Sequence, residues 1–108
     1  MKIIESKNYK KDYKKIILDR HLEREKNRIE NIKSVIIKSD NLQSLLLNGY
    51  SKVYYIEKKK GNLKQFYTAR VNSKIRLIMK PIGIYPYEKI EITEIEFVNI
   101  DDTHYGEG

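Results

Sequence analysis

Residues 66–80 read FYTARVNSKIRLIMK, in which two stretches of alternating polar and apolar side chains are joined by Asn-Ser-Lys. Alternation with a period of two is typical of β-strands, and a short polar segment between two such stretches predicts a hairpin. A three-residue turn places Val71 opposite Ile75, so that the apolar faces of the two strands coincide. The same register places Arg70 opposite Arg76 on the other face of the hairpin.

This pair of arginines needs an explanation. Like charges directly opposite each other in a sheet are mildly destabilising. The arrangement is explained if an anion such as a phosphate binds between Arg70 and Arg76. The alternative is that both arginines are simply solvated on the outer face of an edge hairpin. The pattern alone is compatible with either interpretation.

Capping residues and a period close to 3.6 predict the helices. Ser6 or Asn8 can cap a first helix, and a longer helix is expected from Asp19. A short third helix over residues 41–47 is expected to end at Asn48-Gly49 in a left-handed cap. The longer helix is expected to cover the apolar face of the sheet. Its apolar residues recur in steps of three, four and seven: Leu18, Leu22, Ile29, Ile32 and Ile36.

Further strands are predicted on both sides of the hairpin. Residues 1–5 are predicted as a short N-terminal strand, and residues 53–57 as a strand that ends in a basic turn. Residues 89–100 are predicted as a final strand with a β-bulge at Thr93-Glu94, where the phase of the apolar residues shifts. The fold class is therefore α+β: a short N-terminal strand, two or three helices, then a mostly antiparallel three- to four-stranded sheet.

Length and composition restrict the class of protein. The 108 residues suffice for a single domain, spanning residues 1–108. The absence of cysteine excludes disulfides and thiol chemistry. Neither a run of 18 apolar residues nor a signal peptide is visible, so we expect a cytoplasmic protein. With two histidines and no cysteine, neither a metal site nor a cofactor is expected.

The net charge of +7 is distributed unevenly along the chain. Residues 1–87 contain 21 Lys and Arg against 8 Asp and Glu, whereas residues 88–108 contain one Lys against seven acids. A basic body of this strength predicts a polyanionic partner such as nucleic acid, which it attracts at long range and binds with release of counterions. The alternative is a surface that reflects only a lysine-rich genome.

Three features of the sequence carry a resemblance to a known family. The residues GNLKQFYT (61–68) precede Arg-Val-Asn at 70–72, Arg-Leu follows at 76–77, and the chain has Asp-Asp-Thr-His-Tyr at 101–105. Together they resemble the RelE/ParE superfamily of bacterial toxins, especially its HigB-like and YoeB-like ribonuclease branches. The order of strand, helices and strands also matches, so the resemblance covers nearly the whole chain.

The resemblance implies a function and partners. It implies the toxin of a type II toxin–antitoxin system, an mRNA endoribonuclease that acts in the ribosomal A site and inhibits translation. It also implies a cognate antitoxin as protein partner, and contact with operator DNA only through that antitoxin.

The resemblance further implies roles for individual residues. Arg76 matches the arginine that stabilises the phosphate, with Arg70 as a second positive group. Glu57 lies where YoeB-like members place a glutamate, and His104 and Tyr105 match a terminal catalytic pair. The sequence departs from the pattern because Gly-Glu-Gly at 106–108 extends past this pair, where several members stop. Lysines are expected to bind the RNA backbone: Lys58, Lys59, Lys60, Lys74 and Lys80.

These residue types suit RNA cleavage without a metal. Such cleavage needs a base for the 2′-OH, an acid for the leaving 5′-oxygen, and cations around the phosphorus. Either Glu57 or His104 could be the base, and the other of the two or Tyr105 the acid. Arginine supplies the charge, because it can bind two phosphate oxygens at once. Which group is base and which is acid stays open.

Two other functions are compatible with the same residues. One is a ParE-like gyrase inhibitor, although that branch usually lacks the terminal His-Tyr pair. The other is a nucleic-acid-binding module without catalysis, which predicts salt-dependent binding and no cleavage.

Overall fold

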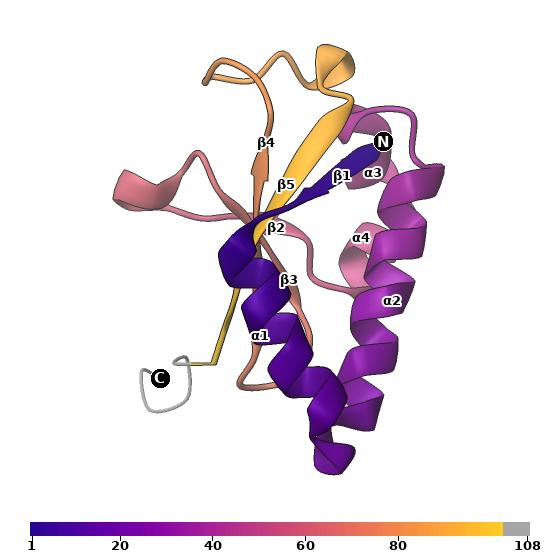
Figure 1. Ribbon diagram of the computed structural model, residues 1–108. Helices are drawn as coiled ribbons and strands as arrows, with labels where there is room; N and C mark the ends of the chain where they lie inside the picture. Colours follow the sequence, from indigo (N-terminus) through magenta and orange to yellow (C-terminus); the bar gives the residue numbers. More distant parts are fainter. Residues whose placement is uncertain (103–108) are drawn as a thin grey trace.

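The computed structural model describes residues 1–102 of the chain. In these residues, helices lie against one side of a five-stranded sheet (Figure 1). The helices are α1 (Lys7–Leu18), α2 (Glu23–Lys38), α3 (Leu42–Leu47) and α4 (Gly49–Val53), with short 3₁₀ turns η1 (Arg20–Leu22), η2 (Gly61–Leu63) and η3 (Lys89–Glu91). The strands are β1 (Lys2–Glu5), β2 (Glu57–Lys58), β3 (Tyr67–Arg70), β4 (Arg76–Pro81) and β5 (Glu94–Asp101).

The sheet is mixed, with the strand order β1-β5-β4-β3-β2. β1 pairs with β5 in parallel, and the other neighbours are antiparallel. The predicted α+β class and the order of an N-terminal strand, helices and then strands are therefore confirmed. The helices carry the chain from β1 to β2 at the opposite edge of the sheet, and β3, β4 and β5 then return by antiparallel steps until β5 lies parallel to β1.

The β3–β4 hairpin has the predicted register. Arg70 pairs with Arg76, and beyond the end of β3 the Val71 N–H donates to the Ile75 carbonyl at 3.0 Å. Ala69 and Leu77 form the next pair, and both are fully buried. Because paired residues share a face, the two arginines lie on the opposite side of the sheet from the core.

The core lies between the helices and one face of the sheet. α2 contributes Ile29, Ile32 and Ile36, all with 0% exposure, as the predicted helical spacing requires. Leu22 packs against this core only in part, while Leu18 ends α1 and is 74% exposed. The assignment of Leu18 to the apolar face was therefore wrong, because the chain breaks between the two helices just after it.

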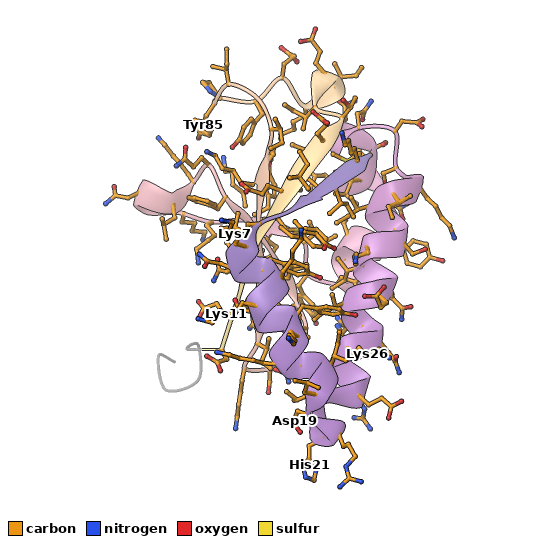
Figure 2. The ribbon with its side chains drawn as sticks, in the orientation of Figure 1. Lys7, Lys11, Asp19, His21, Lys26 and Tyr85 are labelled. Atoms are coloured by element: carbon orange, nitrogen blue, oxygen red, sulfur yellow. The ribbon has the colours of Figure 1, made fainter. Side chains whose placement is uncertain are left out.

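The break between α1 and α2 is stabilised locally. The Asp19 side chain accepts a hydrogen bond from the His21 backbone N–H at 2.9 Å, which caps η1. Both residues lie at the far end of the helix pair (Figure 2). The predicted cap of α1 is confirmed, since the Ser6 hydroxyl accepts from the Tyr9 N–H at 3.0 Å. Side-chain oxygens thus satisfy backbone donors at both helix starts.

The segment after α3 differs from the prediction. Asn48 has extended backbone angles instead of a left-handed cap, and its side chain accepts from the Tyr50 N–H to start α4. The predicted strand over residues 53–57 was wrong, because Val53 ends α4 and only Glu57 and Lys58 pair with β3. Hydrogen bonds from the Ser51 hydroxyl to the Leu46 and Asn48 carbonyls favour the helical turn over β propensity here.

The bulge in β5 also lies elsewhere than predicted. Residues 89–91 form the η3 turn, and β5 begins at Glu94, so the phase shift in the sequence marks the start of the strand. The register instead shifts between Ile78 and Met79, which pair with Asn99 and Phe97 and leave Val98 as the extra residue. A bulge of this kind depends on the partner strand, so the sequence of β5 alone does not reveal it.

Over residues 1–102, no helix is long and apolar enough to cross a membrane.

The position of Ile32 allows a test of the packing. Ile32→Ala should lower the free energy of unfolding by about 2–5 kcal/mol, because it leaves a cavity between α2 and the sheet. Ile37→Ala is the matched control on the same helix, since Ile37 is 59% exposed. Urea denaturation followed by circular dichroism measures both. Equal, small effects of the two substitutions would show that the packing face of α2 is misassigned.

Candidate functional site

The face of the sheet opposite the helices carries two rows of side chains. Residues that pair across a sheet share a face, so the register defines the rows. One row consists of Arg70, Arg76 and Asp101, and the next of Glu57, Thr68, Ile78 and Asn99. None of the four α-helices within residues 1–102 packs on this face, because the residues that they bury belong to the other face. We call it the open face.

Arg70 rests on an aromatic ring. Its guanidinium carbon lies 3.8 Å from the centroid of the Tyr55 ring, a cation–π contact. Tyr55 has a backbone φ of 52°, a left-handed conformation that is rare for an aromatic residue. This backbone conformation goes together with the position of the ring against the Arg70 guanidinium. Backbone strain of this kind is concentrated at functional sites. The buried Nε of Arg70 has no hydrogen-bond partner within the described part of the chain.

The backbone of Arg70 is held from α2. The Arg28 Nε donates to the Arg70 carbonyl at 2.7 Å, and its Nη2 donates to the Val53 carbonyl at 2.9 Å. The Arg28 guanidinium also lies over the Tyr54 ring, 4.8 Å from its centroid. On the other side, the Arg70 N–H donates to the Tyr54 carbonyl at 2.7 Å. Arg28 thus joins α2, the end of α4 and the end of β3 at one point.

Arg76 is held by the hairpin turn. Its Nη1 donates to the Asn72 carbonyl at 2.6 Å and to the Ile75 carbonyl at 3.2 Å. The Asn72 side chain accepts from the backbone N–H groups of Lys74 and Ile75, and its Nδ2 donates to Glu25 of α2 at 2.9 Å. This chain of contacts holds the guanidinium through one nitrogen, and a guanidinium has further N–H donors that these two contacts do not use.

The electrostatics of Arg76 reflect its neighbours. Burial lowers the pKa of Arg76, and the nearby charge of Arg70 lowers it further, whereas Glu57 acts in the opposite direction. Arginine starts so far above neutrality that it stays charged. The two guanidinium groups therefore repel each other across β3 and β4, and an anion between them would remove that repulsion.

The other predicted site residues are distributed unevenly. Glu57 is exposed on the open face, one row from the arginines, and Lys59 and Lys80 lie on this face as well. Lys58 lies opposite the buried Tyr67 and thus on the other face of β2. Lys60 and Lys74 lie in exposed turns beside η2 and between β3 and β4. The predicted pair His104 and Tyr105 lies outside the described residues.

Sequence reasoning did not identify Arg28, Tyr55 or the anchoring role of Asn72. Nothing in the sequence distinguishes Arg28 from the other charged residues of its helix. No sequence signal marked Tyr55, because a left-handed tyrosine cannot be recognised from residue type. Asn72 was quoted as part of the Arg-Val-Asn motif, and its turn-forming chemistry was visible in principle. Its further role, as the anchor of Arg76 through its carbonyl, depends on the folded turn.

The joint formed by Arg28 can be tested by its stability effect. Arg28→Ala should lower the free energy of unfolding by about 1–3 kcal/mol, because two carbonyls lose charge-assisted donors. Arg24→Ala removes the same charge from an exposed position one turn earlier and should change stability by no more than about 0.5 kcal/mol. Guanidinium denaturation of the two variants measures the difference. If Arg28→Ala lowers the free energy of unfolding no more than Arg24→Ala does, Arg28 does not stabilise the junction of α2, α4 and β3.

The protein was compared with known sequences and solved structures. No protein-family model and no curated protein sequence matches it. A YoeB dimer from Staphylococcus aureus is similar in structure, with 21% identity, coverage of 97% of this chain and 98% of that chain, and a TM-score of 0.64. YafQ from E. coli strain BL21(DE3) has 18% identity, covers 93% and 90%, and has a TM-score of 0.65.

A YoeB/ParE toxin from Agrobacterium tumefaciens is more distant in sequence, with 13% identity. It covers 96% of this chain and 100% of that chain, with a TM-score of 0.59. The similarity thus extends over nearly the full length of each of these proteins. The chain therefore shares its fold with these YoeB, YafQ and YoeB/ParE proteins.

Proposed function

We propose that this protein is the toxin of a type II toxin–antitoxin system, an endoribonuclease that cleaves mRNA on the ribosome and thereby inhibits translation. The observation that carries this proposal is the pair Arg70 and Arg76, held side by side on the open face of a RelE-like fold. Glu57 in the neighbouring row adds a group that can transfer a proton. The resemblance in the sequence motifs supports the same assignment.

The arrangement suits charge stabilisation during cleavage. When the 2′-oxygen attacks the phosphorus and the bond to the 5′-oxygen breaks, negative charge grows on the phosphoryl oxygens. Arg76 and Arg70 supply two cations for that charge without a metal. The products are a 2′,3′-cyclic phosphate and a 5′-hydroxyl, with one proton removed from the nucleophile and one added to the leaving group.

Proton transfer requires groups other than the arginines. Arginine keeps its proton at any pH relevant to the cell, so it cannot act as base or acid. We assign this task to Glu57, His104 and Tyr105, the three residues that the family resemblance nominates. β5 carries the chain to Asp101, which pairs with Arg76, three residues before His104 in the sequence.

The surface charge supports RNA as the substrate. Lys59 and Lys80 lie on the open face with the site. Lysines also occur on the helix side, where Figure 2 shows Lys7 and Lys11 on α1 and Lys26 on α2. A basic surface of this extent attracts RNA at long range, but it does not determine which phosphate of the RNA is placed for cleavage. The arginine pair supplies that placement.

An antitoxin partner is proposed on separate grounds. Structures with this fold include a heterotetrameric YoeB–YefM toxin–antitoxin complex from Staphylococcus aureus and a DinJ–YafQ complex from E. coli. An uncovered basic face in the present chain would accept an acidic partner through complementary charge. We infer that such a partner blocks the open face and thereby keeps the nuclease inactive.

Arginine substitutions test the nuclease proposal. Arg76→Ala should lower cleavage of mRNA on translating ribosomes by about 10²-fold or more, because it removes a charge that matters most in the transition state. Arg24→Ala is the matched control, since it removes the same charge from the exposed surface of α2 and should leave cleavage unchanged. His104→Ala should also lower cleavage by about 10²-fold or more, with little loss of RNA binding. Primer extension on ribosome-bound mRNA measures all three variants.

Three outcomes would contradict the assignment. Cleavage that is unchanged in Arg76→Ala would discard the arginine pair as the reaction site. Growth arrest with intact mRNA and inhibited gyrase supercoiling would replace the nuclease by a ParE-like gyrase inhibitor. Salt-dependent RNA binding without any cleavage would leave only a binding module.

The antitoxin proposal has its own test. Expression of the chain alone should arrest growth, and co-expression of a neighbouring open reading frame for an acidic protein with a DNA-binding half should restore it. The two proteins should then co-purify as a complex. An unrelated acidic protein of similar size is the control, because it tests whether charge alone suffices. Growth arrest that persists under co-expression, with no complex formed, would contradict the proposed partner.

A further inference from the structure

A small apolar pocket lies on the open face beside the arginine pair. Its volume is about 250 Å³, and its lining consists of Lys59, Leu63, Phe66, Ile78, Val98, Asn99 and Asp101. Ile78 follows Arg76 by two positions on β4, about 7 Å along the strand, so it lies on the same face in the neighbouring row. Asp101 lines the pocket and also pairs with Arg76. The pocket and the arginine pair are therefore adjacent.

The pocket is built by two irregular features. Val98 is the extra residue of the β5 bulge, so the spacing of β4 and β5 is locally disturbed at Ile78. Opposite, the η2 turn brings Leu63 next to Phe66, whose N–H donates to the Leu63 carbonyl at 2.9 Å. Gly61 starts this turn with a φ of 69°, which glycine adopts without strain. Figure 1 shows the turn projecting from the sheet on the side away from α2.

The lining combines four kinds of chemistry. Ile78 is 8% exposed and forms an apolar floor on a face that none of the four α-helices covers. Phe66 supplies an aromatic wall, and its carbonyl accepts a hydrogen bond from the Lys59 N–H at 2.9 Å, which places the lysine beside it. Asn99 adds an amide, and Asp101 a carboxylate. An apolar wall with polar groups at its edge is typical of a site for a planar polar ligand.

We propose that this pocket binds one nucleobase of the RNA, next to the phosphate held by Arg70 and Arg76. Phe66 stacks on the face of the base, and the Asn99 amide forms hydrogen bonds to its edge. The amide of Asn99 both donates and accepts hydrogen bonds, so this edge discriminates among bases by the pattern of donors and acceptors that they present. The inference rests on the proposed function for its substrate and adds the position that sets base preference.

The adjacency argues for a nucleobase over a side chain of a protein partner. In RNA each phosphate is followed by a base. An anion site with an aromatic pocket in the neighbouring row of side chains therefore matches the phosphate and the base of one nucleotide. Lys59 on the far side of the pocket would contact the next phosphate. A protein partner would require no such alternation of cation, aromatic wall and cation along one line.

Binding of an uncleavable oligonucleotide tests the pocket directly. The probe is a short RNA with a 2′-O-methyl group at every position, so that no cleavage can occur, and binding is measured by fluorescence anisotropy. Phe66→Leu, which keeps an apolar side chain but removes the ring, should weaken binding by about tenfold. Tyr50→Leu is the matched control, because Tyr50 is 55% exposed on the helix side and should leave binding unchanged.

Cleavage of a randomised RNA library tests base preference. The wild-type protein should favour particular bases at one position next to the cleaved bond. Phe66→Leu and Asn99→Leu should reduce that preference at the same position while cleavage still requires Arg76. Thermal unfolding of both variants establishes that they are folded.

The two assays distinguish a failure of the pocket proposal from a failure of the nuclease proposal. Unchanged binding and unchanged base preference in both variants would overturn the pocket. A different result would be that the wild-type protein binds RNA in a base-dependent way but does not cleave it, and that Phe66→Leu abolishes this binding. That result would support the pocket and contradict the nuclease. Binding of a partner protein that is lost in Phe66→Leu, with RNA binding retained, would assign the pocket to that partner and overturn the inference.

Discussion

The register of the β3–β4 hairpin is the constraint on which the fold and the site both depend. It is set at the turn, where the Asn72 side chain accepts two backbone N–H groups and the Val71 N–H donates to the Ile75 carbonyl. Because side chains alternate along a strand, a slip of one residue would place the two arginines on opposite faces of the sheet and expose either Ala69 or Leu77. A single turn therefore determines which face is core and which face is open.

Helix α2 connects the core with the site. Its apolar side contributes three fully buried isoleucines, whereas Glu25 and Arg28 in its first half bond to the hairpin turn and to the end of β3. The geometry of the arginine pair thus depends on the same helix that stabilises the protein. A substitution that loosens α2 would disturb both, which is why stability must be measured alongside any effect on activity.

The open face contains several features that are unfavourable for folding alone. Two arginines lie opposite each other, the Nε of Arg70 is buried without a partner within residues 1–102, and Tyr55 adopts a left-handed backbone. The apolar pocket next to them interrupts a charged surface. Features that weaken a fold and gather in one place are typical of a binding or catalytic site. An anionic ligand between the two arginines would offset their mutual repulsion.

Local pattern determined most of the framework. The hairpin register, the Ser6 cap and the buried face of α2 follow from periodicity and side-chain chemistry within a few residues, and the structure confirms them. The arginine pair was predictable for the same reason, because register follows from alternation. The part of the site assigned to His104 and Tyr105 rests on the family resemblance and stays a prediction.

Only the tertiary structure decided the remaining features. α4 replaces a β-prone segment because Ser51 bonds to carbonyls of the preceding turn, and the bulge at Val98 arises from its pairing with β4. The support of Arg70 by Tyr55 and Arg28 joins three segments that are distant in sequence. Contacts of this kind depend on where separate elements meet in space, and no local pattern encodes that meeting.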